Sequence, residues 1–173
     1  MCCLPALSEN ELTHCKVIRS HTMNIEVRPA RMADADAISR VVLAALRTSN
    51  AKDYPASVIE RVQLSFSPAA IEQLMQQRQV FVASEGHVVR GTASLEGEVV
   101  RSVFVDPDRH RQGIGRLLMA ELEVVARKAG AARMVVPSSL TAREFYLALG
   151  FSVVREHLEG EERTLIMERQ LRV

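Results

Sequence analysis

The sequence of 173 residues contains no tryptophan, only 4% aromatic residues and no apolar run long enough to cross a bilayer. Its formal net charge of +1 argues against nucleic acid as a partner, since it has no basic stripe interleaved with aromatic residues. Its three cysteines all lie within the first fifteen residues, so the fold cannot depend on disulfide bonds. Their odd number predicts reduced thiols and a cytoplasmic protein. With 47% hydrophobic and 25% charged residues, the chain is expected to form one globular domain.

The first 22 residues differ from the rest because they show neither helical nor strand periodicity. We interpret residues 1–22 as a loose, disordered extension, or one that comes from an upstream start, ahead of a single domain at residues 23–173. Residues 1–7 make a poor secretory signal because this segment carries no leading positive charge. A metal site is the alternative for this segment, but its spacing matches no usual zinc pattern, and we expect no metal. Its ligands would be Cys2, Cys3, His14, Cys15 and His21.

Periodicity over the remaining residues predicts a mixed α+β fold. Alternating or continuous apolar residues predict strands over residues 24–29, 79–83, 88–95, 98–105, 133–136, 151–157 and 163–169. Apolar residues at helical spacing predict helices after an N-cap at Asp34 and over residues 57–64, 67–75, 113–128 and 141–149. Gly130 and Gly150 are placed to end the last two. This order argues against a Rossmann domain, whose glycine loop would follow the first strand.

The segment 105–118, V-D-P-D-R-H-R-Q-G-I-G-R-L-L, predicts a strand, a short basic loop and an amphipathic helix. Gly113 and Gly115 allow a ligand to approach the backbone closely. The first turn of the helix leaves N–H groups unpaired, and the helix dipole adds partial positive charge there. The junction is therefore expected to bind phosphate or pyrophosphate. It is not a P-loop, because Arg116 and Leu117 follow Gly115 where Lys and Ser or Thr would be required.

A second motif, S-S-L-T-A-R-E-F-Y-L-A-L-G-F, occupies residues 138–151. With the first motif, it resembles the GNAT superfamily of N-acetyltransferases, which use acetyl-CoA. The first motif is similar to that family's loop (Gln or Arg)-x-x-Gly-x-(Gly or Ala), and the second to its Phe-Tyr-x-x-x-Gly-Phe helix. The resemblance covers roughly residues 24–170. It implies an α/β sandwich whose mixed, mostly antiparallel sheet of about six to seven strands has helices on both faces.

The same resemblance implies the binding mode of acetyl-CoA as co-substrate. The backbone amides from Gln112 to Arg116 are expected to hold the pyrophosphate, and the end of the preceding strand is expected to bind the pantetheine arm. Two positions depart from the family pattern, His110 in place of Gln or Arg and Ser139 in place of Asn. An ordinary tight turn is the alternative for the glycines. The implied cofactor-binding residues are Val103, Phe104, Val105, His110, Arg111, Gln112, Gly113, Ile114, Gly115, Arg116, Ser139, Ala142 and Tyr146.

The resemblance also implies transfer of the acetyl group to a primary amine, by direct attack in a ternary complex. Tyr146 matches the family's tyrosine that protonates the departing thiolate; a packing aromatic is the alternative. Phenols titrate near ~10 and thiols near ~8.5, so the two groups are of similar basicity. Glu98 is the candidate general base, at the start of the cofactor strand. Its alternatives are a solvated strand-end carboxylate or a water relay.

The acceptor site is expected between the first two helices. There, Asp53 beside Tyr54 could hold a cationic amine, although residues 52–55 are equally consistent with a plain turn. A small molecule or a protein lysine fits as the acceptor. A homodimer is suggested by analogy alone. A non-catalytic acyl-CoA-binding sensor is the alternative function.

Overall fold

The computed structural model describes residues 24–160 and 162–171, so the N-terminal extension and its alternative metal ligands lie outside the described residues. The strands are β1 (Ile25–Pro29), β2 (Gln79–Glu85), β3 (Val88–Glu96), β4 (Val99–Val105), β5 (Arg133–Ser139), β6 (Ser152–Glu159) and β7 (Glu162–Gln170). The helices are α1 (Ala35–Thr48), α2 (Ala56–Leu64), α3 (Pro68–Gln77), α4 (Ile114–Lys128) and α5 (Arg143–Ala148). Three short 3-10 turns are η1 (Met32–Asp34), η2 (Asn50–Lys52) and η3 (Pro107–Arg109). Every predicted element is present, with its ends shifted by a few residues.

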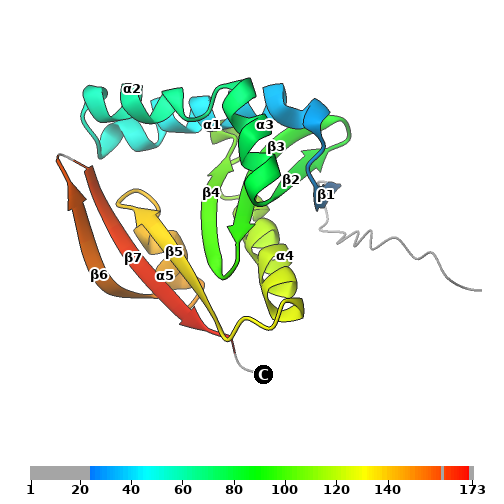
Figure 1. The fold of residues 1–173 in the computed structure, drawn as a ribbon. Coiled ribbons are helices and arrows are strands. Elements are labelled where there is room, and N and C mark those ends of the chain that lie inside the picture. Colours follow the sequence, from blue (N-terminus) through cyan, green and yellow to red (C-terminus); the bar gives the residue numbers. More distant parts are fainter. Residues whose placement is uncertain (1–23, 161, 172–173) are drawn as a thin grey trace, which may run out of the picture.

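The strands form one seven-stranded sheet in the order β1-β2-β3-β4-β5-β7-β6. Neighbouring strands are antiparallel except β4 and β5, which are parallel. In the described residues, β4 and β5 pair at Val99 and Val135, near the beginning of both strands. Beyond that point they diverge, and the sheet opens into two parts (Figure 1). The predicted mixed, mostly antiparallel sheet is confirmed.

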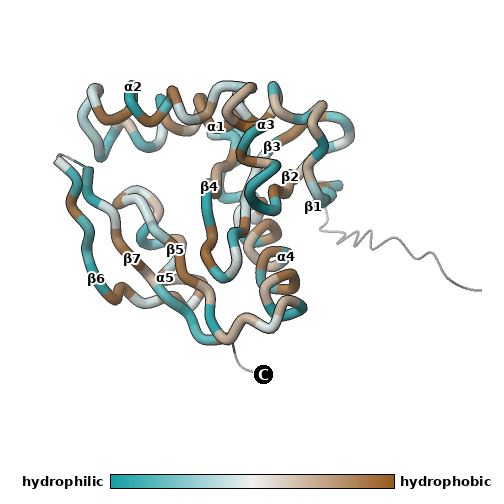
Figure 2. Tube along the Cα trace, in the orientation of Figure 1, coloured by the Kyte–Doolittle hydropathy of each residue, from teal (hydrophilic) through white to brown (hydrophobic). Residues whose placement is uncertain are grey.

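Helices cover both faces of the sheet, as predicted. On one face, α1 and α3 enclose a cluster that includes Ile38, Val42 and Val82. On the other face, α4 contributes Leu118 and Leu122 to a second cluster, which extends to β5, α5 and β7. Figure 2 shows the hydrophobic residues of α1 and α4 recurring between hydrophilic ones, as expected for helices with one buried face. No helix in the described part of the chain is both long and apolar enough to span a membrane.

The polar residues that precede α3 and α1 behave differently. Ser67 caps α3, since its Oγ accepts a hydrogen bond from the Ala70 N–H at 3.3 Å. Asp34 precedes α1 but caps the preceding turn instead: its carboxylate accepts from the Arg31 N–H at 2.7 Å and pairs with Arg28 at 2.8 Å. The hydrogen bond from Arg28 is the largest cause that lowers the pKa of Asp34.

Candidate active site

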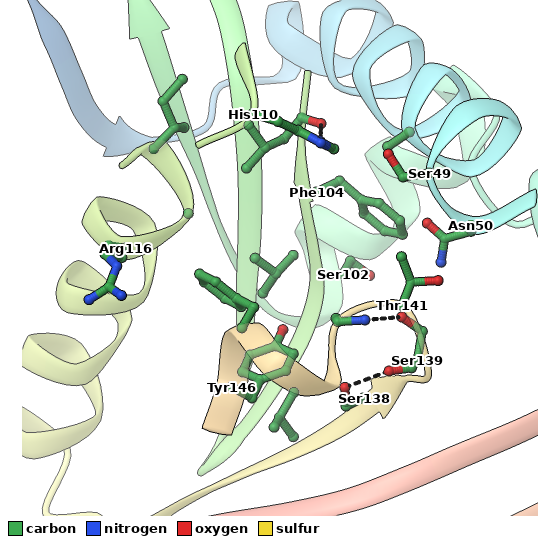
Figure 3. Close-up of a pocket in the computed structure, with 18 of the residues that line it drawn as sticks. Ser49, Asn50, Ser102, Phe104, His110, Arg116, Ser138, Ser139, Thr141 and Tyr146 are labelled. Carbon is green, nitrogen blue, oxygen red and sulfur yellow. Dashed lines mark hydrogen bonds between the residues drawn. The ribbon is translucent and has the colours of Figure 1, made fainter. Parts of the chain in front are cut away.

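A cavity of about 710 Å³ lies where β4 and β5 diverge. Its walls come from the end of α1, β4, the loop before α4, the start of α4, β5 and α5 (Figure 3). This size is typical of sites for small molecules and cofactors. The predicted residues that line it are Asp53, Val103, Phe104, Val105, His110, Arg111, Gly113, Ile114, Gly115, Arg116, Ser139, Ala142 and Tyr146.

A β-bulge in β4 shapes one wall of the cavity. Thr92 and Ser94 of β3 pair with Phe104 and Arg101, so β4 holds one residue more than β3 between these pairs. Ser102 lies in this bulge with a left-handed φ of 52°. A bulge bends its strand and strengthens the local twist, which favours divergence from β5. Past Val99, the edge of β4 that faces β5 has no strand partner in the described residues, so its backbone groups can bind a ligand.

The loop between β4 and α4 turns through two left-handed residues, Arg111 with a φ of 60° and Gly113 with a φ of 83°. Backbone N–H groups in such a turn converge and form an anion-binding concavity. A non-glycine residue in this conformation is strained, which often marks a functional site. The His110 Nε2 lies 3.2 Å from the Val105 carbonyl oxygen and ties the loop to the end of β4. His110 therefore contacts the protein backbone where the sequence suggested a donor to the cofactor.

The first turn of α4 has free backbone donors at the cavity. Leu117 N–H donates to the Gly113 carbonyl at 3.0 Å, the first bond of the helix. The N–H groups of Ile114, Gly115 and Arg116 precede it and therefore have no partner within the helix. Together with the positive end of the helix dipole, they form an anion site. Arg116, in this first turn of α4, is among the residues that line the cavity (Figure 3).

The two glycines at this junction are required for different reasons. A Cβ at Gly113 would meet no atom within 4 Å, so its left-handed backbone is what favours glycine. A Cβ at Gly115 would lie 3.1 Å from the Phe145 Cζ, closer than ordinary van der Waals contact. Gly115 therefore allows α4 and α5 to approach each other at the cavity.

Tyr146 comes from α5 and is 4% exposed. Its ring makes edge contacts with Phe145 and Phe151, at centroid distances of 5.0 and 5.6 Å. Figure 3 shows the hydroxyl group directed into the cavity. Burial raises the pKa of Tyr146 well above its ordinary value, because the ionised phenolate would lose its hydration. The phenol is therefore protonated at neutral pH and available as a donor.

Three other predicted residues have positions that the sequence did not indicate. Glu98 lies outside the cavity lining, and its carboxylate pairs with Arg133 at 2.9 Å. Tyr54 also lies outside the lining; its hydroxyl accepts from the Leu140 N–H and donates to the Arg163 carbonyl, both at 2.8 Å. Gln112 is exposed in the loop, next to the lining residues.

Besides His110, two predicted lining residues have partners within the protein. Asp53 accepts a hydrogen bond from the Thr141 hydroxyl at 2.7 Å. The Ser139 Oγ accepts from the Ala142 N–H at 3.3 Å and so closes the turn before α5.

The sequence did not indicate several polar residues of the cavity. Ser102 lies within a predicted strand, and a bulge leaves no clear mark in a single sequence. Others come from the end of α1, η2, the end of β5 and the turn after it, where the predicted helices and strands stop: Ser49, Asn50, Lys52, Ser138 and Thr141. Small polar residues in such breaks are the one signal that could have indicated them.

The acetyltransferase (GNAT) domain family matches residues 50–167, more than half of the chain. The match includes the diverging strands, the basic loop and α5. The chain belongs to this family, and it is an acyltransferase. No curated protein matches the chain in sequence.

Solved structures show the same fold. A GCN5-related N-acetyltransferase from Rhodopseudomonas palustris is 24% identical, with a TM-score of 0.78 over 84% of this chain and 94% of that one. The PaiA N-acetyltransferase from Thermoplasma acidophilum, in complex with coenzyme A, is 20% identical, with a TM-score of 0.73 over 86% of this chain and 100% of that one. YncA from Salmonella typhimurium, with its cofactor acetyl-CoA, is 23% identical, with a TM-score of 0.62 over 87% and 95%.

Proposed function

We propose that this acyltransferase moves the acetyl group of acetyl-CoA to a primary amine of a small molecule or protein, by direct attack in a ternary complex. The observation that carries the proposal is the cavity between β4 and β5, which has an anion-binding helix start at its wall and a buried tyrosine in its lining. The neighbours solved with coenzyme A or acetyl-CoA support the choice of co-substrate.

The residues present fit a coenzyme A thioester. The N–H groups of residues 112–116 bind the pyrophosphate, as the left-handed loop and the helix dipole favour negative charge there. The unpaired edge of β4 at Val103 and Val105 binds the amides of the pantetheine arm, in the manner of an added strand. This binding places the thioester beside the bulge.

The reaction forms a C–N bond and breaks the C–S bond of the thioester. The attacking nitrogen must be neutral, so a base or a water molecule takes its proton. The carbonyl oxygen gains negative charge as nitrogen attacks, and a free N–H of β4 stabilises it. The sulfur leaves as a thiolate and needs a hydrogen-bond donor.

Tyr146 is the donor to the departing sulfur. Because burial raises the pKa of its phenol, complete proton transfer to a thiolate is less favourable than for two groups of similar basicity. A hydrogen bond that stabilises the leaving sulfur is therefore its main contribution. Glu98, paired with Arg133 outside the cavity lining, does not support a role as base. We propose a water relay instead. Asp53, which belongs to the predicted acceptor site, is a carboxylate in the cavity lining.

We further propose a cytoplasmic location, no bound metal and no nucleic-acid partner. A homodimer is supported by β6, an edge strand whose residues are all exposed.

The proposal is tested by calorimetric titration with acetyl-CoA and by a thiol-release screen across a panel of primary amines. We expect micromolar binding and release of coenzyme A with at least one amine. Gly113→Glu should weaken binding by about 100-fold, because it places a carboxylate and a strained backbone at the phosphate site. Gly86→Glu is the matched control, since Gly86 is also left-handed, with a φ of 59° and open space around it, but lies in the β2–β3 turn.

Two results would contradict parts of the proposal. Unchanged affinity in Gly113→Glu would show that the loop does not bind the cofactor. Normal acetyl-CoA binding without thiol release for any amine would favour the non-catalytic sensor.

A further inference from the structure

Among the described residues, the Arg78 side chain has no hydrogen-bond or ion-pair partner. It follows α3 directly, and its backbone N–H donates to the Leu74 carbonyl at 3.0 Å. Its Nε is buried without a hydrogen-bond partner, and no carboxylate among the described residues forms an ion pair with its guanidinium. The nearby Glu96 and Arg101 pair with each other at 3.2 Å, so Glu96 is already occupied.

The guanidinium of Arg78 lies beside a small recess between α1, α3 and the sheet. Its apolar lining comes from both helices together with Phe66 and Val80, and its uncharged polar lining comes from Thr92, Ser94 and Ser102. The Thr92 hydroxyl donates to the Phe81 carbonyl and the Ser94 hydroxyl to the Arg101 carbonyl, both at 3.0 Å. The recess contains no lining carboxylate, and its volume of about 10 Å³ has room for one water molecule at most.

Ser102 connects this recess to the active-site cavity, because it lines both. It is also the left-handed residue of the β4 bulge, beside which the proposed thioester lies. An acceptor that places its amine at the bulge therefore contacts Ser102, and Arg78 lies at the recess that Ser102 also lines. Arg78 and the neighbouring Arg101 are accompanied by one carboxylate, Glu96, so this group of three charges is net positive.

A partly buried guanidinium whose nearby carboxylate is already paired with another arginine is costly, and burial lowers the pKa of Arg78. Arginine nevertheless stays protonated in proteins and presents a planar fork that suits a carboxylate. Such a group is retained at a cost to stability when a ligand supplies the missing negative charge.

We propose that Arg78, with the Ser102 hydroxyl, recognises a carboxylate on the acceptor, so that the preferred acceptors are amines that also carry a carboxylate. This proposal rests on the proposed acetyl transfer and names its substrate class. The carboxylate binds at the mouth of the recess, since the recess itself is too small to contain it.

The test compares ω-amino carboxylates of increasing chain length with their carboxamides, which have the same amine and no negative charge. We expect the wild-type kcat/KM to favour the carboxylate of at least one pair by tenfold or more. Arg78→Met should lower kcat/KM for that carboxylate by about 10- to 100-fold, mainly through KM, and leave the carboxamide and the affinity for acetyl-CoA unchanged. Arg78→Lys should restore part of the preference, because it keeps the charge but not the fork.

Arg40→Met is the matched control, since Arg40 is an exposed arginine on α1 outside both the cavity and the recess. The proposal is overturned if carboxylates and carboxamides are used equally, or if no amine that carries a carboxylate is acetylated. It is also overturned if Arg78→Met lowers kcat/KM equally for the carboxylate and its carboxamide. The last result would indicate a structural arginine satisfied by water. Failure of the proposed function itself is distinguishable, because acetyl-CoA would then not bind or no amine would release thiol.

Discussion

The two tyrosines of the chain differ in whether the hydroxyl group is hydrogen-bonded within the protein. The Tyr54 hydroxyl has a donor and an acceptor within the protein, at Leu140 and Arg163. The Tyr146 hydroxyl has no protein partner in the described residues and faces the cavity. The first hydroxyl is therefore committed to the fold, whereas the second is free for a substrate atom.

Tyr146→Phe tests this difference by removing only the hydroxyl. The ring contacts with Phe145 and Phe151 are kept, so the fold and the affinity for acetyl-CoA should not change. We expect kcat to fall roughly 100-fold, at the lower end of the effect of a general acid. Steady-state kinetics with a good acceptor measures it, and undiminished turnover would exclude the role in catalysis.

The pH dependence of stability provides a second test of Tyr146. Its pKa is raised in the folded state, whereas the unfolded chain releases this proton near pH ~10. The associated stability is present below that pH and is lost as the pH rises above it, because unfolding then releases a proton. We expect the free energy of unfolding of Tyr146→Phe to fall less than that of the wild type between pH 9 and 11. The difference between the two slopes should correspond to the release of about one proton on unfolding. Parallel decreases in urea titrations would contradict the assigned burial.

At the scale of elements, the site depends on how closely α4, α5 and the loops approach one another. Gly115 brings α4 against Phe145 of α5, and Tyr54 joins the loop before α2 to the ends of β5 and β7. Arg61 and Glu162 add a second link between α2 and β7, at 2.8 Å. Gly115 and Phe145 line the cavity themselves, whereas the other residues of these contacts position its walls from outside.

Gly115→Ala should weaken acetyl-CoA binding because the new Cβ would displace the Phe145 ring. We expect a loss of about tenfold, measured by calorimetry, and recovery of most of it in the double variant with Phe145→Leu. Gly113→Ala is the matched comparison, since its defect is conformational and Phe145→Leu should not correct it. Equal recovery in both backgrounds would contradict the contact as the cause.

Tyr54→Phe should destabilise the protein while leaving the chemistry intact. It leaves the Leu140 N–H and the Arg163 carbonyl without their partner, at a cost of about 1–3 kcal/mol in the free energy of unfolding. Urea denaturation measures the loss, and Tyr146→Phe, which breaks no hydrogen bond within the described residues, is the control. Comparable losses in the two variants would show that the Tyr54 link does not stabilise the fold.

At the scale of the whole molecule, the sheet consists of two parts that pair at Val99 and Val135 and otherwise separate around the cavity. One part contains β1 to β4 with α1, α3 and α4 on its faces, and the other contains β5, β6 and β7 with α5. A ligand in the cavity contacts both parts. Binding should therefore stabilise the molecule as one unit.

Acetyl-CoA at 100 times its dissociation constant should contribute about 2.7 kcal/mol to stability. For a chain of this size, each kcal/mol shifts Tm by about 2–4 °C, so we expect a rise of about 5–10 °C. Scanning fluorimetry with an added dye measures the shift, and Gly113→Glu at the same concentration should show little of it. No shift in the wild type would contradict binding in the cavity.

Local patterns in the sequence determined the order of strands and helices, the glycine loop before α4 and the helix that carries Tyr146. Each is encoded within a few consecutive residues, by periodicity, capping or the need for a left-handed backbone. Those signals do not depend on how distant segments meet, and they were sufficient to predict most of the residues that line the cavity.

Only the tertiary structure decided the divergence of β4 and β5, the bulge at Ser102, the pairing of Glu98 with Arg133 and the unpartnered guanidinium of Arg78. Each depends on residues far apart in sequence, and the same residue type can be solvated, paired or buried according to its neighbours. A glutamate at a strand end therefore looked like a base, and an arginine after a helix looked unremarkable. The charge balance around a side chain exists only once the chain has folded.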